Sequence, residues 1–274
     1  MKRSTRREIA KDTLKILENG FYINENEKRI EFRKAQKNAE QHTKVYTPQE
    51  LLQLIEQLPE REVEIQTEFI VNDLTTLDSV RSEYQSETKL LCLNFASARN
   101  PGGGFLNGSQ AQEESIARAT GLYNCQLKGE IYYKKNRQID TCLYTDYIIY
   151  SPQVPIIKDE AGKLLMEPNY VSIITAPAVN TGVVLRNELA NVEKIATIMS
   201  RRIDMVLAIC YEQKYKTIIL GAWGCGVFRN DPVLIAKMFK ELLNGKYKNV
   251  FNKVVFSIYS KDERFIKPFR EEFG

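Results

Sequence analysis

Residues 94–123 read NFASARNPGGGFLNGSQAQEESIARATGLY. They overlap the end of a short apolar run, Lys89–Phe95, which is typical of a strand buried inside a sheet. Apolar residues then recur at helical spacing from Ile116 onward, and Ser109 with Gln112 has the S-x-x-Q spacing of a helix capping box. The stretch therefore predicts a buried strand, a glycine turn and a helix in direct succession.

The remaining chain alternates between helical and strand-like segments in the same manner. Helices are predicted at 4–18, from Thr47, from Thr75, at 189–210 and at 232–243. Strands are predicted at 62–71, 89–95, 171–177, 217–220 and 253–259. This alternation favours a mixed α/β class, with a largely parallel or mixed sheet covered by helices. Residues 22–42 read as a polar, partly helical arm, so we separate a helical extension, 1–45, from a main domain, 46–274.

Three consecutive glycines and two adjacent carboxylates are the first candidate site. Gly102, Gly103 and Gly104 follow the predicted strand, and each glycine costs conformational entropy that a merely stable loop rarely needs. Close approach of a ligand would explain them. Glu113 and Glu114 fall in the first turn of the next helix, where acidic residues also simply favour the helix dipole. Because neighbours on a helix point about 100° apart, we expect the two carboxylates to have different roles.

A second glycine loop lies near the C-terminus, where residues 217–232 read TIILGAWGCGVFRNDP. A loop of this kind between a strand and a helix presents several backbone N–H groups to one point, which suits phosphate oxygens. A tight turn is an equally good interpretation of the loop alone. Cys225 has no histidine nearby in sequence to activate it, so we interpret it as a small loop residue. Phe228 either covers a ribose or base or belongs to the core.

Composition excludes several other functions. The 274 residues are 43% hydrophobic, carry a net charge of +4 and contain one histidine, His42. A histidine-based triad or metal site would depend on that single residue. The five cysteines are scattered and odd in number, which favours a reducing, intracellular compartment over a disulfide framework. The chain has no apolar run of membrane-spanning length and no basic stripe typical of a nucleic-acid binder.

Taken together, the two glycine segments resemble the microbial type of poly(ADP-ribose) glycohydrolase. The resemblance rests on G-G-G followed after seven residues by Q-E-E, and on GAWGCGVFRNDP. It extends from about Tyr46 to the C-terminus through Leu143–Asp146, Ile149–Pro152 and Thr175–Pro177. It implies a macrodomain-like fold, a mixed sheet between helices with ADP-ribose in a crevice at the strand ends.

The resemblance also implies roles for individual residues. Glu114 would be the catalytic acid and base, acting through an oxocarbenium-like state, and Glu113 would hold the distal ribose with Asn100 and Gln112 nearby. The first glycine loop would approach the ligand through Gly102, Gly103 and Gly104. The diphosphate and ribose would be wrapped by Gly224, Cys225, Gly226, Val227 and Phe228. Adenine contacts are expected near Asn72–Thr75.

The expected function is therefore the reversal of ADP-ribosylation by a hydrolase that needs no metal and no cofactor. Its partners would be poly(ADP-ribose), ADP-ribose and ADP-ribosylated proteins. We expect a cytoplasmic monomer away from membranes, or a nuclear one in a eukaryote. The resemblance also implies cleavage mainly from the polymer terminus, because the microbial type closes the ribose end of its cleft. The sequence supports this in part, since the bulky segment Tyr144–Met166 could wall off one end of the groove. That segment could equally be an ordinary packed excursion. The alternatives are an ADP-ribose-binding macrodomain without activity and a mono-ADP-ribosyl or acetyl-ADP-ribose hydrolase.

Overall fold

A mixed sheet lies at the centre of the molecule. The structure is a computed structural model that describes residues 1–57, 65–85 and 89–274. In these ranges seven strands pair in the order β3-β6-β7-β5-β8-β9-β4. Their bounds are β3 Lys44–Tyr46, β4 Glu68–Asn72, β5 Leu90–Phe95, β6 Ile148–Lys158, β7 Leu164–Ala176, β8 Thr217–Leu220 and β9 Lys253–Ser257.

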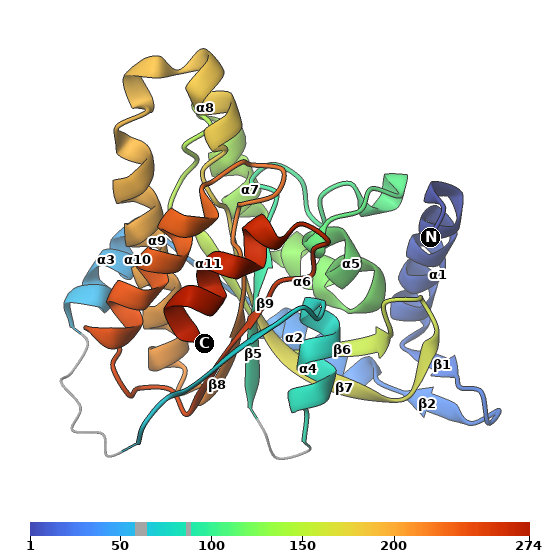
Figure 1. The fold of residues 1–274 in the computed structure, drawn as a ribbon. Helices are drawn as coiled ribbons and strands as arrows, with labels where there is room; N and C mark the ends of the chain where they lie inside the picture. Colours follow the sequence, from blue (N-terminus) through green and yellow to red (C-terminus); the bar gives the residue numbers. More distant parts are fainter. Residues whose placement is uncertain (58–64, 86–88) are drawn as a thin grey trace.

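The strand directions gather several loops at one edge of the sheet. From β7 through β5, β8 and β9 to β4 every pairing is parallel, whereas β6 is antiparallel to both β7 and β3. The carboxyl ends of five strands therefore share one edge, where open α/β sheets bind their ligands. Both glycine loops leave the sheet there, after β5 and β8 (Figure 1).

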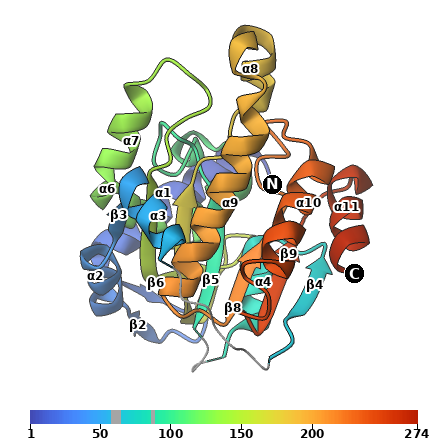
Figure 2. The same ribbon diagram turned by 90° about the vertical axis from the view of Figure 1, so that its left-hand side faces the viewer.

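Helices cover both faces of the sheet. One face carries α3 Pro48–Glu56, α9 Lys194–Glu212, α10 Pro232–Asn244 and α11 Glu263–Phe273, with α9 and α10 in front of the strands in Figure 2. The other carries α2 Arg33–Gln41, α4 Thr76–Glu83, α5 Gln112–Ala119 and α6 Leu122–Lys128. Strand β5 alternates between them, because Leu91 and Leu93 join one buried cluster while Leu90 and Cys92 join the other. The predicted α/β sandwich with a mixed sheet is confirmed.

The remaining elements lie outside these two layers or at the rim. They are α1 Arg3–Asn19, the hairpin of β1 Phe21–Ile23 and β2 Arg29–Glu31, η1 Phe105–Asn107, α7 Glu130–Arg137, α8 Thr181–Asn187 and η2 Leu189–Asn191. No helix in the described ranges is both long enough and apolar enough to span a bilayer.

Several predicted boundaries are confirmed at residues that satisfy helix ends locally. Thr47 forms a full capping box with Glu50, Thr75 accepts a hydrogen bond from the backbone of Asp78, and Asp231 caps α10 ahead of a proline. These caps use side chains within three residues of the helix start, so the sequence alone reveals them.

Other predicted elements differ from the structure. The arm at 22–42 contains a β-hairpin and then α2, and the helix expected from residue 189 begins at Lys194 after the short turn η2. The strand predicted at 62–71 begins at Glu68, and residues 62–64 lie outside the described ranges. The division between residues 45 and 46 stays a prediction; β3 spans this point and pairs with β6.

Candidate active site

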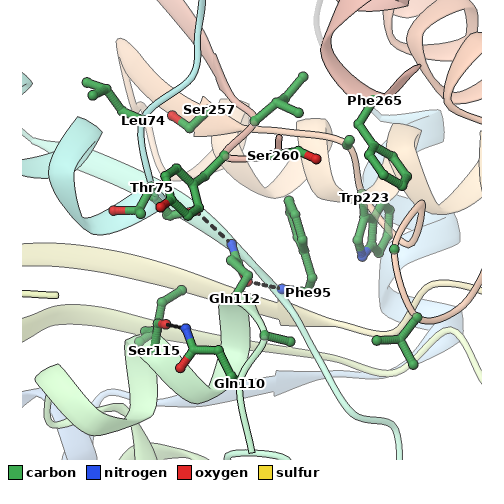
Figure 3. A pocket seen from close by; sticks show the side chains of 18 of the residues that line it. Leu74, Thr75, Phe95, Gln110, Gln112, Ser115, Trp223, Ser257, Ser260 and Phe265 are labelled. Carbon is green, nitrogen blue, oxygen red and sulfur yellow. Dashed lines mark hydrogen bonds between the residues drawn. The ribbon is translucent and has the colours of Figure 1, made fainter. Parts of the chain in front are cut away.

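A cavity of about 740 Å³ opens at the carboxyl edge of the sheet, within the size range of small-molecule sites. Most of its lining comes from the segments that follow five parallel strands: Leu74, Thr75, Thr76 and Asp78 after β4, Gln110, Ala111, Gln112, Ser115 and Ile116 after β5, Ala178 after β7, Ala222, Trp223, Gly224, Gly226, Val227 and Phe228 after β8, and Ile258, Tyr259, Ser260 and Phe265 after β9. Figure 3 shows side chains from these segments directed at a common space. Segments far apart in the sequence thus meet because their strands run in parallel.

Gln112 fastens the start of α5 to the edge of β5. Its Oε1 accepts a hydrogen bond from the backbone N–H of Phe95 at 2.8 Å, and its Nε2 donates to the carbonyl of Leu93 at 2.7 Å and to Thr76 at 3.0 Å (Figure 3). The predicted capping box of Ser109 and Gln112 is wrong. The helix begins at Gln112 without a side-chain cap, because the Gln112 amide is engaged by the strand.

Glu113 is buried in a cradle of hydrogen-bond donors, with only 3% of its surface exposed. Its Oε1 accepts from Asn94 at 3.2 Å and from Gln126 at 2.9 Å, and its Oε2 accepts from the backbone N–H of Ser97 at 2.6 Å. Burial raises the pKa of Glu113 to about 8, against the opposite effect of these three hydrogen bonds, and the neighbouring charge of Glu114 adds a smaller increase. The cradle therefore fixes this carboxyl tightly, whereas its ionisation is costly.

Glu114 lies half-buried on the first glycine loop. Its Oε1 accepts a hydrogen bond from the backbone N–H of Gly104 at 2.9 Å, and its Oε2 accepts none from the described residues. Gly102 and Gly103 adopt φ of +65° and +57°, and a Cβ on Gly103 would collide with the carboxyl group of Glu114. The glycines are thus required both by backbone conformation and by the close approach of Glu114.

The second glycine loop is held open toward the cavity. Gly224 has φ of +75° and no room for a Cβ beside Asn230 and Ala178, whereas a Cβ on Gly226 would meet no protein atom within 4 Å. Asn230 supports the loop by donating hydrogen bonds to the carbonyls of Val179 at 2.8 Å and Gly224 at 3.1 Å. The space in front of Gly226 is therefore free for a ligand.

The structure brings most of the sequence-predicted residues to this edge. Gln112, Gly224, Gly226, Val227 and Phe228 line the cavity. Glu113, Glu114, Gly102, Gly103 and Gly104 are not among the lining residues. The two glutamates stand between the lining residues Gln112 and Ser115 on α5, and the glycines lie in the loop that Glu114 contacts. Asn100 is exposed in the turn before the glycines. Cys225 is buried, does not line the cavity, and has its thiol pKa raised by burial.

Only part of the region expected to contact adenine, Asn72–Thr75, lines the cavity. Leu74 and Thr75 line the cavity, but the side chain of Asn72 instead accepts hydrogen bonds from the Leu74 backbone at 3.2 Å and from Ser79 at 3.2 Å.

Sequence reasoning missed several lining residues, among them Met1, Arg6, Glu160, Trp223 and Phe265. Trp223 and Phe265 follow β8 and β9, and the rule that ligands bind beyond strand ends could have indicated them. Met1 and Arg6 of the N-terminal segment, and Glu160 between β6 and β7, arrive through tertiary packing that no local pattern reveals.

No group of three His, Cys, Asp or Glu side chains in the described ranges is arranged to hold a metal ion. Metal independence stays a prediction.

Comparison with known proteins identifies the family. Residues 10–159, more than half of the chain, match the family model described as microbial-type PARG, catalytic domain. No curated protein matches the chain.

Solved structures agree with the family match. Poly(ADP-ribose) glycohydrolase from Thermomonospora curvata is 36% identical over 98% of this chain and 100% of that chain, with a TM-score of 0.94. The same enzyme bound to the inhibitor ADP-HPD has a TM-score of 0.90. The Deinococcus radiodurans glycohydrolase in complex with ADP-ribose is 40% identical over 86% of this chain and 96% of that chain, with a TM-score of 0.81. With this fold, these two glycine loops and these matches, the chain belongs to the microbial-type poly(ADP-ribose) glycohydrolase family.

Proposed function

We propose that this chain hydrolyses the ribose–ribose O-glycosidic bonds of poly(ADP-ribose) and releases ADP-ribose. The observation that carries the proposal is the pair of carboxyl groups at the start of α5. One is buried and held by three donors, and the other rests on a glycine loop with one oxygen free of hydrogen bonds from the described residues. Family membership supports polymer hydrolysis over the alternatives.

In the proposed reaction Glu114 donates its proton to the leaving 2′-oxygen as the glycosidic C–O bond breaks. The ribose then has oxocarbenium character at C1″. Glu114, now a carboxylate, removes a proton from water as the water oxygen bonds to C1″, which restores the acid. The free Oε2 of Glu114 is the atom available for these transfers.

The other residues hold the substrate on either side of the bond. Glu113 uses three of roughly four carboxylate lone-pair positions on protein donors, which leaves one for a hydroxyl of the distal ribose near Asn100. Backbone N–H groups from Gly224 to Phe228 would receive the diphosphate. The adenine would lie toward Leu74 and Thr75.

Cleavage from the polymer terminus is part of the proposal. Only the start of the segment 144–166 supports it, because most of the segment forms β6 and β7 inside the sheet. The ring of Tyr144 lies 6.0 Å from that of Phe228, which lines the cavity. Behind it, Glu188 accepts a hydrogen bond from the backbone of Cys142 at 2.8 Å and another from Asn191 at 3.1 Å, which ties this loop to the turn after α8.

A time course on long polymer of defined length tests the function. Monomeric ADP-ribose in the first minutes is the expected result. Early release of medium-length oligomers would contradict terminal cleavage alone, and no product at all would contradict the glycohydrolase assignment.

Two alternatives make different predictions in the same assay. A binding macrodomain would retain polymer without product, and a mono-ADP-ribosyl or acetyl-ADP-ribose hydrolase would act on those substrates and leave polymer intact. We further propose that the polymer cleaved by the enzyme is attached to ADP-ribosylated proteins. We also propose that the enzyme is a monomer and acts inside the cell, in the cytoplasm.

A further inference from the structure

Four basic side chains form a patch beside the first glycine loop. Arg99 lies in the turn after β5, and Lys134, Lys135 and Arg137 lie in the last turn of α7. All four are exposed, and none forms an ion pair with any residue in the described ranges. We call these residues the Arg99 patch. They present four positive charges that the described protein leaves unneutralised.

Hydrogen bonds through Ser97 connect the turn that carries Arg99 to Glu113. The backbone N–H of Ser97 donates to Glu113 at 2.6 Å, while Ser97 Oγ accepts from the backbones of Arg99 at 3.3 Å and Asn100 at 3.1 Å. The guanidinium of Arg137 donates to the carbonyl of Arg99 at 2.7 Å, which fastens α7 to this turn. The backbone of this turn and the end of α7 therefore have a fixed position relative to Glu113.

The same turn leads to the catalytic acid. The carbonyl of Asn100 accepts a hydrogen bond from Gly103 at 3.0 Å, and Gly104 donates to Glu114 at 2.9 Å. Since Glu114 protonates the leaving oxygen, the departing part of the substrate must begin on this side of the site. That oxygen belongs to an adenosine whose 5′ position carries a diphosphate, so two negative charges lie within one nucleoside of the bond.

The stability of α7 explains why basic residues occur at only some positions of the patch. Cations in the last turn of α7 favour its dipole, which accounts for Lys134, Lys135 and Arg137. Arg99 is not in a helix, and its side chain makes no hydrogen bond or ion pair with the described residues. None of the four residues lines the cavity that would hold the bound ADP-ribose unit.

We propose that the Arg99 patch binds the diphosphate of the leaving polymer unit, the unit joined through its 2′-oxygen to the ribose held by Glu113. This inference rests on the proposed function and adds a second substrate subsite to it. The patch acts on polymer and not on isolated ADP-ribose, so it favours polymer over short substrates.

Two variants test the proposal without altering the cavity. Arg99→Ala removes the side chain but keeps both backbone hydrogen bonds, and the pair Lys134→Glu with Lys135→Glu changes charge on the exposed face of α7. Binding of long polymer is measured in the Glu114→Gln background at several salt concentrations, with calorimetry of ADP-ribose alongside. We expect polymer affinity to fall roughly three- to tenfold in each, with a shallower salt dependence, and ADP-ribose affinity to stay unchanged.

The matched control is Lys34→Glu with Lys37→Glu on α2, which makes the same change in net charge on exposed lysines. Polymer affinity unchanged by the patch variants, or lowered equally by the control pair, would overturn the proposal. Turnover of polymer is measured separately with the wild-type protein, which retains Glu114. Its absence would overturn the proposed function, while the binding data would still decide whether the patch holds polymer.

Discussion

At the scale of single residues, two adjacent glutamates occupy very different surroundings. Glu113 is almost fully enclosed and receives three hydrogen bonds, whereas Glu114 is half-buried and receives one. Neighbouring positions on a helix point about 100° apart, so one side chain enters the protein while the other lies against the first glycine loop. Two identical side chains thus have separate environments, which is the basis for the separate roles that we propose for them.

The enclosure of Glu113 predicts a pH-dependent stability. Its pKa is raised by burial to about 8 in the folded protein, above the value of an exposed glutamate. The folded state then binds the proton more tightly than the unfolded state does. The contribution of Glu113 to the free energy of unfolding is therefore complete at acidic pH and is lost as pH rises from about 4.5 to about 8. Glu113→Gln cannot ionise. Relative to wild type, its free energy of unfolding should therefore increase across this window, by at most roughly 4 kcal/mol.

Urea unfolding of wild type and Glu113→Gln at pH 5 and pH 8 measures this effect. A difference between the two proteins that does not change with pH would show that the carboxyl does not titrate in this range.

Gly226 offers a substitution that separates binding from folding. A Cβ at this position meets no protein atom within 4 Å, so Gly226→Val should keep the melting temperature of wild type. The added branches would occupy the space proposed for phosphate oxygens. The affinity for ADP-ribose in calorimetry should then fall roughly ten- to hundredfold, the loss expected for one charge-assisted hydrogen bond.

Gly224→Val is the contrasting variant. Its positive φ and its contacts with Asn230 and Ala178 predict a loss of stability in addition to any loss of binding. Unchanged ADP-ribose affinity in Gly226→Val would exclude this loop from the binding site.

At the scale of elements, the site depends on how α5 is attached to β5. Local signals in the sequence revealed helices that cap themselves, as at Thr47 and Asp231. The start of α5 was mispredicted because Gln112 bonds across to the strand, a partner that only the folded chain provides. Helix α11 was not predicted, and Pro268 within it is a residue that normally argues against a helix.

The sequence likewise predicts only part of the candidate site. The glycines and glutamates stand close together in sequence, and their pattern is specific. The cradle of Asn94 and Gln126 around Glu113, and the contribution of Arg6 to the cavity, come from separate elements and follow only from the packing.

Gln112→Leu should weaken both the attachment of α5 and catalysis. The leucine has similar volume but loses three hydrogen bonds, which predicts a loss of about 2–4 kcal/mol in the free energy of unfolding. Turnover should fall as well, because Glu114 is two residues further along the same helix. Gln53→Leu, an exposed position on α3, is the matched control. Wild-type turnover in a Gln112→Leu protein would show that this attachment does not position the acid.

At the scale of the whole molecule, parallel strands collect distant segments at one edge and thereby build the cavity. The proposed carboxylate chemistry uses no bound ion, and no group of three potential metal-ligand side chains lies together in the described ranges. We therefore expect turnover of polymer to be the same in EDTA as in its absence. A lasting loss in EDTA that one divalent ion reverses would contradict a metal-free mechanism.

The most direct test of the account compares wild type with Glu114→Gln on poly(ADP-ribose) of defined length. The amide oxygen can still accept the hydrogen bond from Gly104, but the amide N–H groups are far too weakly acidic to protonate the leaving oxygen. We predict that wild type releases ADP-ribose and that the variant is slower by roughly 10²–10⁴-fold, with nearly unchanged affinity for ADP-ribose. Wild-type turnover by a folded Glu114→Gln protein would contradict the assignment of Glu114 as the catalytic acid.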